Sequence, residues 1–167
     1  MYGPIITEFT KMLKNLDQQM QKAAGYADQK KFDVNVLATT RLAPDMYAFN
    51  KQVQIACDAA KFCAAYLAKK EAPKHEDKET TWTELRERIG KTVQYLETFR
   101  DTDFKDTATV KVSPRWAEGK WLPADEYVNQ LAIPNFYFHV TVAYSLLREA
   151  GVGVGKEDFI GNLNFRN

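Results

Sequence analysis

The feature that most constrains the fold is an apolar segment, Leu131 to Leu147, with few polar residues. In a helix, its apolar side chains would point in nearly every direction, so neighbouring elements must cover it on all sides. Pro134, Asn135 and His139 make the segment too polar for a membrane span. We therefore expect a buried helix inside a helical domain.

Three earlier segments carry apolar residues at helical spacing: 4–24, 44–70 and 81–99. Gly25 suits the end of the first helix, and Pro44 suits the first position of the second. Thr81 and Glu84 match the capping box, in which each side chain satisfies the other's end of a helix start. Long helices separated by loops favour a bundle.

Between the third and last helices the pattern changes to alternation. Residues 107–112 alternate, and Trp121-Leu122 follow a turn, which predicts a small β-hairpin. The tail, 152–167, keeps apolar residues and should dock on the body. The prediction is an all-α four-helix bundle with a β-hairpin before the last helix, as one domain over residues 1–167.

Composition narrows the function classes. The net charge is +1 and no basic run interleaves with aromatic residues, so no nucleic-acid partner is indicated. The first residues lack a secretory signal, and no membrane partner is indicated. Cys57 and Cys63 lie six residues apart on a predicted helix, facing roughly 120° apart, so we expect reduced buried thiols in a cytoplasmic protein.

Asn135 and His139 are the main candidates for a site, since residues four apart share one helix face. Buried polar groups need partners, and Gln54 and Asp58 on the second helix are candidates. Asp58 beside His139 would hold the imidazole in one tautomer and favour its charged form. Two interpretations stay open: a polar pocket between two helices, or a satisfied buried histidine that fixes helix register.

Other polar features are weaker candidates. Arg41 lies four residues before Asp45, so the two could form an ion pair or clamp a carboxylate, or simply cap the helix entry. His75 lies in a charged loop and should be solvated. No HxxxH, HExxH or ExxH pattern occurs, so no metal-ligand set is complete in the sequence.

Several strings together resemble an uncharacterised bacterial family within the DinB/YfiT-like metalloenzyme superfamily. The strings are Arg41-Leu-Ala-Pro-Asp-Met46, Gln52-Val-Gln-Ile-Ala-Cys-Asp58, Ile133-Pro-Asn-Phe-Tyr-Phe-His139-Val-Thr141, and Gly155-Lys-Glu-Asp-Phe-Ile-Gly161. The resemblance covers essentially the whole chain. It implies a DinB-type four-helix bundle that is commonly a homodimer.

The resemblance also implies a metal position. Superfamily members bind a divalent metal through three histidines, one on the second helix and an HxxxH pair on the last, and some are thiol-dependent transferases or isomerases. His139 matches the second histidine of the pair, Asn135 stands at the first, and Gln54 or Asp58 stands on the second helix. An oxygen-rich set of these residues would suit a harder cation, held weakly.

The resulting hypothesis is a degenerate metal site in a protein that binds a small molecule or acts as a dimeric interaction protein. The alternative is a metal-dependent enzyme, such as a thiol-dependent transferase, with His139 and Asp58 as ligands or as a general acid and base. A third possibility is a bundle that serves only as an oligomerisation scaffold.

Overall fold

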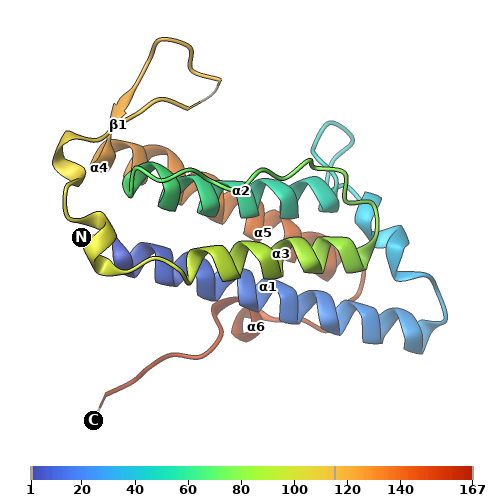
Figure 1. The fold of residues 1–167 in the computed structure, drawn as a ribbon. Helices are drawn as coiled ribbons and strands as arrows, with labels where there is room; N and C mark the ends of the chain where they lie inside the picture. The colour runs from blue at the N-terminus through green and yellow to red at the C-terminus, as the bar shows by residue number, and fades with distance from the viewer. Residues whose placement is uncertain (1, 115, 167) are drawn as a thin grey trace.

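The computed structural model describes residues 2–114 and 116–166. Its long helices are α1 (Gly3–Lys30), α2 (Phe49–Leu67), α3 (Trp82–Leu96) and α5 (Ile133–Glu149) (Figure 1). The shorter elements are the 3₁₀-helices η1 (Val34–Thr39), η2 (Asp101–Phe104) and η3 (Thr107–Thr109), helix α4 (Ala124–Tyr127), the π-helix η4 (Val128–Ala132), and helix α6 (Lys156–Ile160). The all-α bundle with a hairpin before the last long helix is confirmed.

The packing of α5 forms the centre of the bundle. Phe136 is fully buried and stacks on Phe9 of α1, with ring centroids 4.2 Å apart. On α2, small residues such as Ala56 and Ala60 are also fully buried. The apolar segment therefore forms a largely buried helix, as predicted, but it is not covered on all sides, because Phe138 is 53% exposed. None of the helices in the described residues combines the length and apolarity that a membrane crossing needs.

Helices α2 and α3 are consecutive in the chain but run parallel. Phe49 at the start of α2 stacks on Trp82 at the start of α3, with centroids 4.8 Å apart. Lys70, just beyond α2, lies 4.9 Å above the ring of Phe99, just beyond α3. Residues 68–81, called the connector below, must therefore run back along the whole length of α2, as Figure 1 shows.

Helix α1 continues past the predicted stop at Gly25. Its last turn has tertiary partners: Ala27 is buried, and the ring of Tyr26 meets that of Phe32 at 5.9 Å. This packing outweighs the low helix propensity of glycine, about 1 kcal/mol relative to alanine. The helix ends instead at Lys30, and the next residue, Lys31, has a left-handed backbone and caps the helix by donating its N–H to the Ala27 and Asp28 carbonyls.

The predicted start of α2 at Pro44 is also wrong. The chain stays irregular through residues 41–48, and the helix begins at Phe49, whose N–H donates to the Thr40 carbonyl. The start of α3 is as predicted: Thr81 and Glu84 form the capping box. The capping box therefore fixes the start of α3, whereas burial of the Phe49 ring fixes the start of α2.

The segment before α5 explains how Pro134 is tolerated. Proline removes a backbone donor and clashes with the preceding helical turn. The wider turn of η4 ends directly before α5, so helix α4, η4 and α5 follow one another with Pro134 in the first turn of α5. The hairpin is shorter than predicted: only β1 (Lys111–Val112) and β2 (Leu122–Pro123) pair, in antiparallel register.

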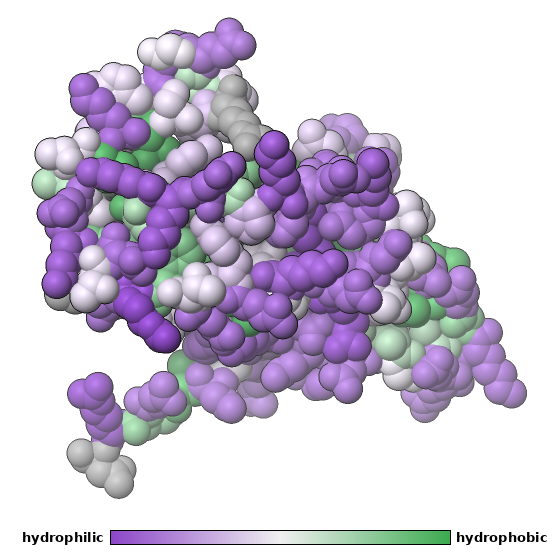
Figure 2. Space-filling model, viewed as in Figure 1, coloured by the Kyte–Doolittle hydropathy of each residue, from purple (hydrophilic) through white to green (hydrophobic). Residues whose placement is uncertain are grey.

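The tail docks as far as Gly161. Asn15 of α1 donates to the Phe159 carbonyl at 3.0 Å, and a Cβ on Gly161 would lie 2.6 Å from the Asn15 amide. Gly161 also has a φ of +69°, which side chains with a Cβ rarely adopt. Both the close contact with Asn15 and this backbone conformation therefore require glycine. Beyond it the docking prediction is wrong, because Leu163 and Phe165 are 54% and 88% exposed. Figure 2 shows this tail leaving the body at the lower left.

The central packing makes a testable prediction. Phe136→Ala should lower the free energy of unfolding by about 3–5 kcal/mol, because it leaves a cavity between α1 and α5. Phe165→Ala, a matched change at an exposed ring, should change it by less than about 0.5 kcal/mol. Urea unfolding followed by circular dichroism measures both. Equal losses would contradict the central position of Phe136.

Candidate functional site

His139 lies on the inner face of α5, where only 7% of it is exposed. Its Nδ1 atom is 2.7 Å from Oε1 of Gln52 on α2. The amide nitrogen of Gln52 donates to the Tyr47 carbonyl at 2.9 Å, which turns the amide oxygen toward the imidazole. A carbonyl oxygen only accepts, so Nδ1 carries the proton and Nε2 carries a lone pair.

The imidazole of His139 is neutral at physiological pH. Burial lowers its pKa from 6.5 to about 4. Within the described part of the chain, no group donates a hydrogen bond to Nε2, and Nε2 is not among the fully buried polar atoms that lack a partner. A buried ring therefore presents one open acceptor atom.

Three further residues are linked to this imidazole, Asn135 by its position on α5, Phe138 by ring contact and Tyr47 through its carbonyl on Gln52. Together with Gln52 they make up what we call the His139 site. Asn135 lies one helical turn earlier, is half-buried, and its amide has no hydrogen bond to a described residue. The ring of Phe138 meets the imidazole edge-on at 5.1 Å and is 53% exposed. Tyr47 is 59% exposed. The site thus combines an amide, an acceptor and two accessible aromatic rings.

The predicted pairing of Asp58 with His139 is wrong. The Asp58 carboxylate lies 2.7 Å from both Arg88 and Lys61. Gln54 donates to Glu79 at 3.0 Å, so it too lies away from the His139 site. The side chains of Asp58 and Gln54 lie on the side of α2 that faces α3 and the connector.

Gln52 is the residue that the sequence reasoning missed. Its position carried a usable signal, because Gln52 lies four and eight residues before Ala56 and Ala60, which are fully buried. Small residues let another helix approach closely, so the stripe that includes Gln52 marks the side of α2 that receives α5.

The other predicted residues lie outside the His139 site or play structural roles. Arg41 donates to the Met46 carbonyl, and no ion pair with Asp45 occurs in residues 2–114 and 116–166. Both are exposed, and Asp45 lies outside the helix that it was expected to start. Of the open interpretations, Arg41 fits a cap of the loop that enters α2.

A second polar cluster holds the connector against α2 and α3. His75 belongs to it: its side chain is only 11% exposed and Nδ1 lies 3.4 Å from the Lys61 amine, so the solvated position is wrong. Burial, with the positive charges of Arg88 and Lys61, lowers the pKa of His75 to about 4. Because the lysine is a donor, Nδ1 of this neutral ring accepts.

The donors at the His139 site do not fit a zinc or nickel triad. One imidazole and two amide side chains stand where the family resemblance implies three histidines. In the described ranges no cluster of three or more histidine, cysteine, aspartate or glutamate side chains has the arrangement of a metal site. Burial raises the pKa of Cys57 and of Cys63 to about 12, so neither supplies a thiolate.

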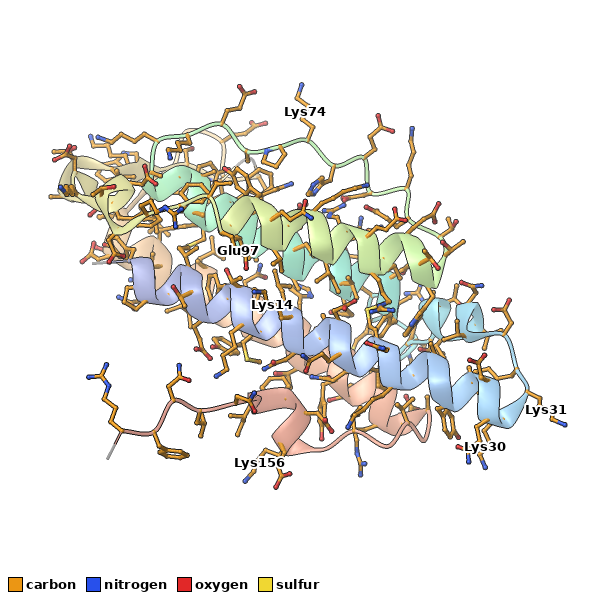
Figure 3. All side chains as sticks on the ribbon, turned by 60° about the horizontal axis from the view of Figure 1, so that its bottom comes forward. Lys14, Lys30, Lys31, Lys74, Glu97 and Lys156 are labelled. Carbon is orange, nitrogen blue, oxygen red and sulfur yellow. The ribbon has the colours of Figure 1, made fainter. Side chains whose placement is uncertain are left out.

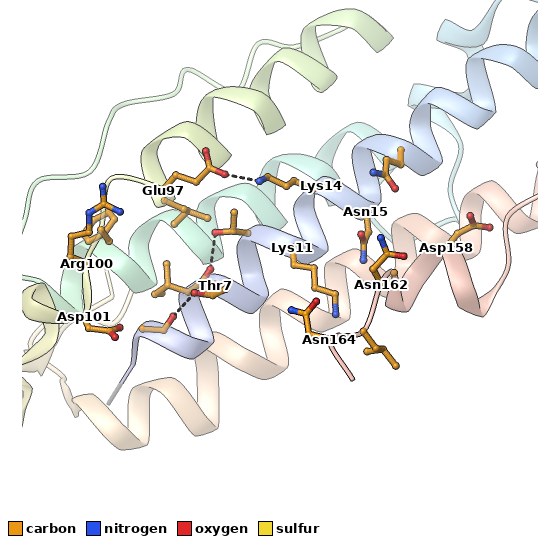
Figure 4. A pocket seen from close by; sticks show the side chains of 18 of the residues that line it. Thr7, Lys11, Lys14, Asn15, Glu97, Arg100, Asp101, Asp158, Asn162 and Asn164 are labelled. Atoms are coloured by element: carbon orange, nitrogen blue, oxygen red, sulfur yellow. Dashed lines mark hydrogen bonds and ion pairs between the residues drawn. The ribbon is translucent and has the colours of Figure 1, made fainter. Parts of the chain in front are cut away.

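A groove with a volume of about 1070 Å³ lies elsewhere. Helix α1, the end of α3 and the tail line it, as Figure 4 shows. Its lysines are already paired, with Lys14 at 2.6 Å from Glu97 (Figure 3) and Lys11 at 3.3 Å from Glu8. No local pattern could reveal this groove, since its walls come from distant segments.

The two buried histidines predict the pH dependence of stability. Both pKa values fall from 6.5 to about 4 on folding, so acidification below pH 6.5 protonates the unfolded chain first. The free energy of unfolding should fall between pH 6.5 and 5 with a slope of up to about 1.4 kcal/mol per pH unit for each histidine. The double variant His75→Gln/His139→Gln should flatten that slope in urea titrations. An unchanged slope would show that other groups cause it.

Comparisons with known proteins agree with this architecture. A family model described as "Domain of unknown function (DUF1993)" matches residues 1–160. A solved structure described as a DinB family member protein from Shewanella denitrificans is 46% identical, with a TM-score of 0.92, and the match covers 97% of this chain and 92% of that one. No curated protein matches. The chain therefore belongs to the DUF1993 family, and its fold is that of the DinB bundles.

Proposed function

We propose that this protein binds a small, neutral, planar molecule at the His139 site, without a resident zinc or nickel ion. The observation that carries the proposal is the open Nε2 acceptor of a ring locked by Gln52. The Asn135 amide, which both donates and accepts, lies on the same helix face. This pair matches a ligand edge that donates one hydrogen bond and accepts another, as a carboxamide does.

Charge and shape narrow the ligand class further. A neutral imidazole with a lone pair outward offers nothing to a carboxylate, which is also only an acceptor. The exposed ring of Phe138 supplies an apolar face beside the acceptor. An aromatic amide fits the Nε2 acceptor, the Asn135 amide and the apolar face of Phe138. Benzamide is the simplest probe of this class.

Nitrogen NMR of the imidazole tests this directly. Benzamide should shift the His139 Nε2 resonance in a saturable way, whereas benzoate, its matched control without a donor, should not. Asn135→Ala should weaken the benzamide response at least tenfold, because about 1.4 kcal/mol of hydrogen bonding is lost. An equal response to both compounds, or none to benzamide, would refute the proposal.

The same samples test the metal-dependent alternative. Zinc should bind the native protein no better than the His139→Gln variant in calorimetry, because a single imidazole is a poor site. The double variant Gln52→His/Asn135→His is the positive control, since it places three imidazoles together. Stoichiometric zinc on the native protein, lost in His139→Gln, would favour the metal-dependent enzyme instead.

We further propose that the protein is a homodimer, with a second copy covering the exposed rings of Tyr47 and Phe138. Large aromatic residues are enriched at the centres of protein interfaces. Light scattering should give twice the 19.1 kDa chain mass, and Phe138→Ser should shift it toward monomer. Trp116→Ser, at a 76% exposed ring on the hairpin loop, is the control. A monomer at every concentration would refute the dimer.

A further inference from the structure

Apart from Ala68, which packs on the core, and Lys70, which lies over the Phe99 ring, the connector is fastened to the bundle by polar contacts. None of residues 68–81 is buried, although the segment crosses the full length of α2. Figure 3 shows it lying over the helices, with Lys74 on its outer side. Its inner contacts are made mainly by Asp77 and Glu79. Charged groups are therefore the main contacts that hold this segment in place.

At the centre of these contacts is Arg88 of α3, whose side chain is 1% exposed. Its guanidinium lies 2.9 Å from Asp77, 2.9 Å from Glu79 and 2.7 Å from Asp58. Burial, the largest single effect, would raise the pKa of Asp77 and of Glu79, but hydrogen bonds and positive charge, chiefly from Arg88, together outweigh it and lower both. These carboxylates are therefore ionised partners of a buried cation.

The helices by themselves leave this cluster with excess positive charge. Lys61, 2% exposed, and Lys51 join Arg88 as cations, while Asp58 is the anion that α2 supplies to the cluster. Three cations against one anion leave a surplus of two, which the connector carboxylates neutralise. Unpaired buried cations are costly, so the helices alone form a site for negative charge.

A pocket of about 420 Å³ lies beside Arg88, between the connector and α3. The Nε atom of Arg88 is buried and has no hydrogen-bond partner among the described residues, so the guanidinium keeps one unused donor. Other acidic groups of the pocket are engaged: Glu84 accepts from the Thr80 and Thr81 N–H groups, and Glu87 faces Lys91 at 4.0 Å. Arg88 is the buried cation of this pocket.

We propose that Arg88, Lys61 and Lys51 form a binding site for a small oxyanion with two negative charges, and that Asp77 and Glu79 occupy this site in cis. A guanidinium forms paired hydrogen bonds with phosphate and with carboxylate groups alike. Binding of such a ligand displaces the connector carboxylates, and the connector lifts from α2. The site is separate from the His139 site, on the side of α2 that faces α3.

Calorimetry with inorganic phosphate and with succinate, at low ionic strength, tests the proposal. The Asp77→Asn/Glu79→Gln variant should bind one of these anions at least tenfold more tightly than the native protein, because the competing carboxylates are gone. Glu76→Gln, on the same segment and paired with Lys78, should bind as the native protein does. Adding Arg88→Gln to the double variant should abolish binding.

The outcomes separate the two ligand chemistries. Preference for phosphate assigns a phosphorylated ligand, preference for succinate assigns a dicarboxylate, and either supports the site. No binding of either anion to the double variant, shown by circular dichroism to be folded, overturns it. So does binding that survives Arg88→Gln. If the double variant does not fold, Asp77→Asn alone is used, and an affinity no tighter than native then overturns the proposal.

Discussion

The packing of α5 against α2 is the contact on which the rest of the structure depends. It sets His139 opposite Gln52, while on the α1 side of the same helix Phe136 is buried against Phe9. Sliding α5 by one turn would move the imidazole about 5.4 Å from its partner. The pairing of His139 with Gln52 is therefore specified by the core, and the loop before α2 adds the Tyr47 carbonyl that orients the amide.

Helix α2 serves two chemically different neighbours. Gln52 faces α5 and holds a neutral imidazole, whereas Gln54 faces the connector and binds Glu79. The two positions are about 200° apart around the helix axis. One side of α2 thus carries a neutral polar pair, and the other is an ionic cluster centred on Arg88. The separation lets each side change without disturbing the other.

The features that the sequence predicted are those encoded locally. The capping box at Thr81, the hairpin and the buried apolar helix all follow from neighbouring residues. The errors share another cause: Gly25 and Asp58 were judged without knowing which segment packs on them. Asp58 turns toward Arg88 because α3 lies parallel to α2, and no helix pattern reveals that direction. Gln52 was missed although the small residues Ala56 and Ala60 on its side of α2 mark the face that receives α5.

The parallel arrangement of α2 and α3 also makes chain length a determinant of topology. A helix of 19 residues spans about 28 Å, which an extended chain covers in roughly nine residues. The connector is longer than that minimum, and the additional length lets its charged groups turn toward the helices. A deletion that left it shorter than this span would force α3 to reverse and produce a different bundle. The number of residues between two helices here encodes the fold as firmly as their apolar faces do.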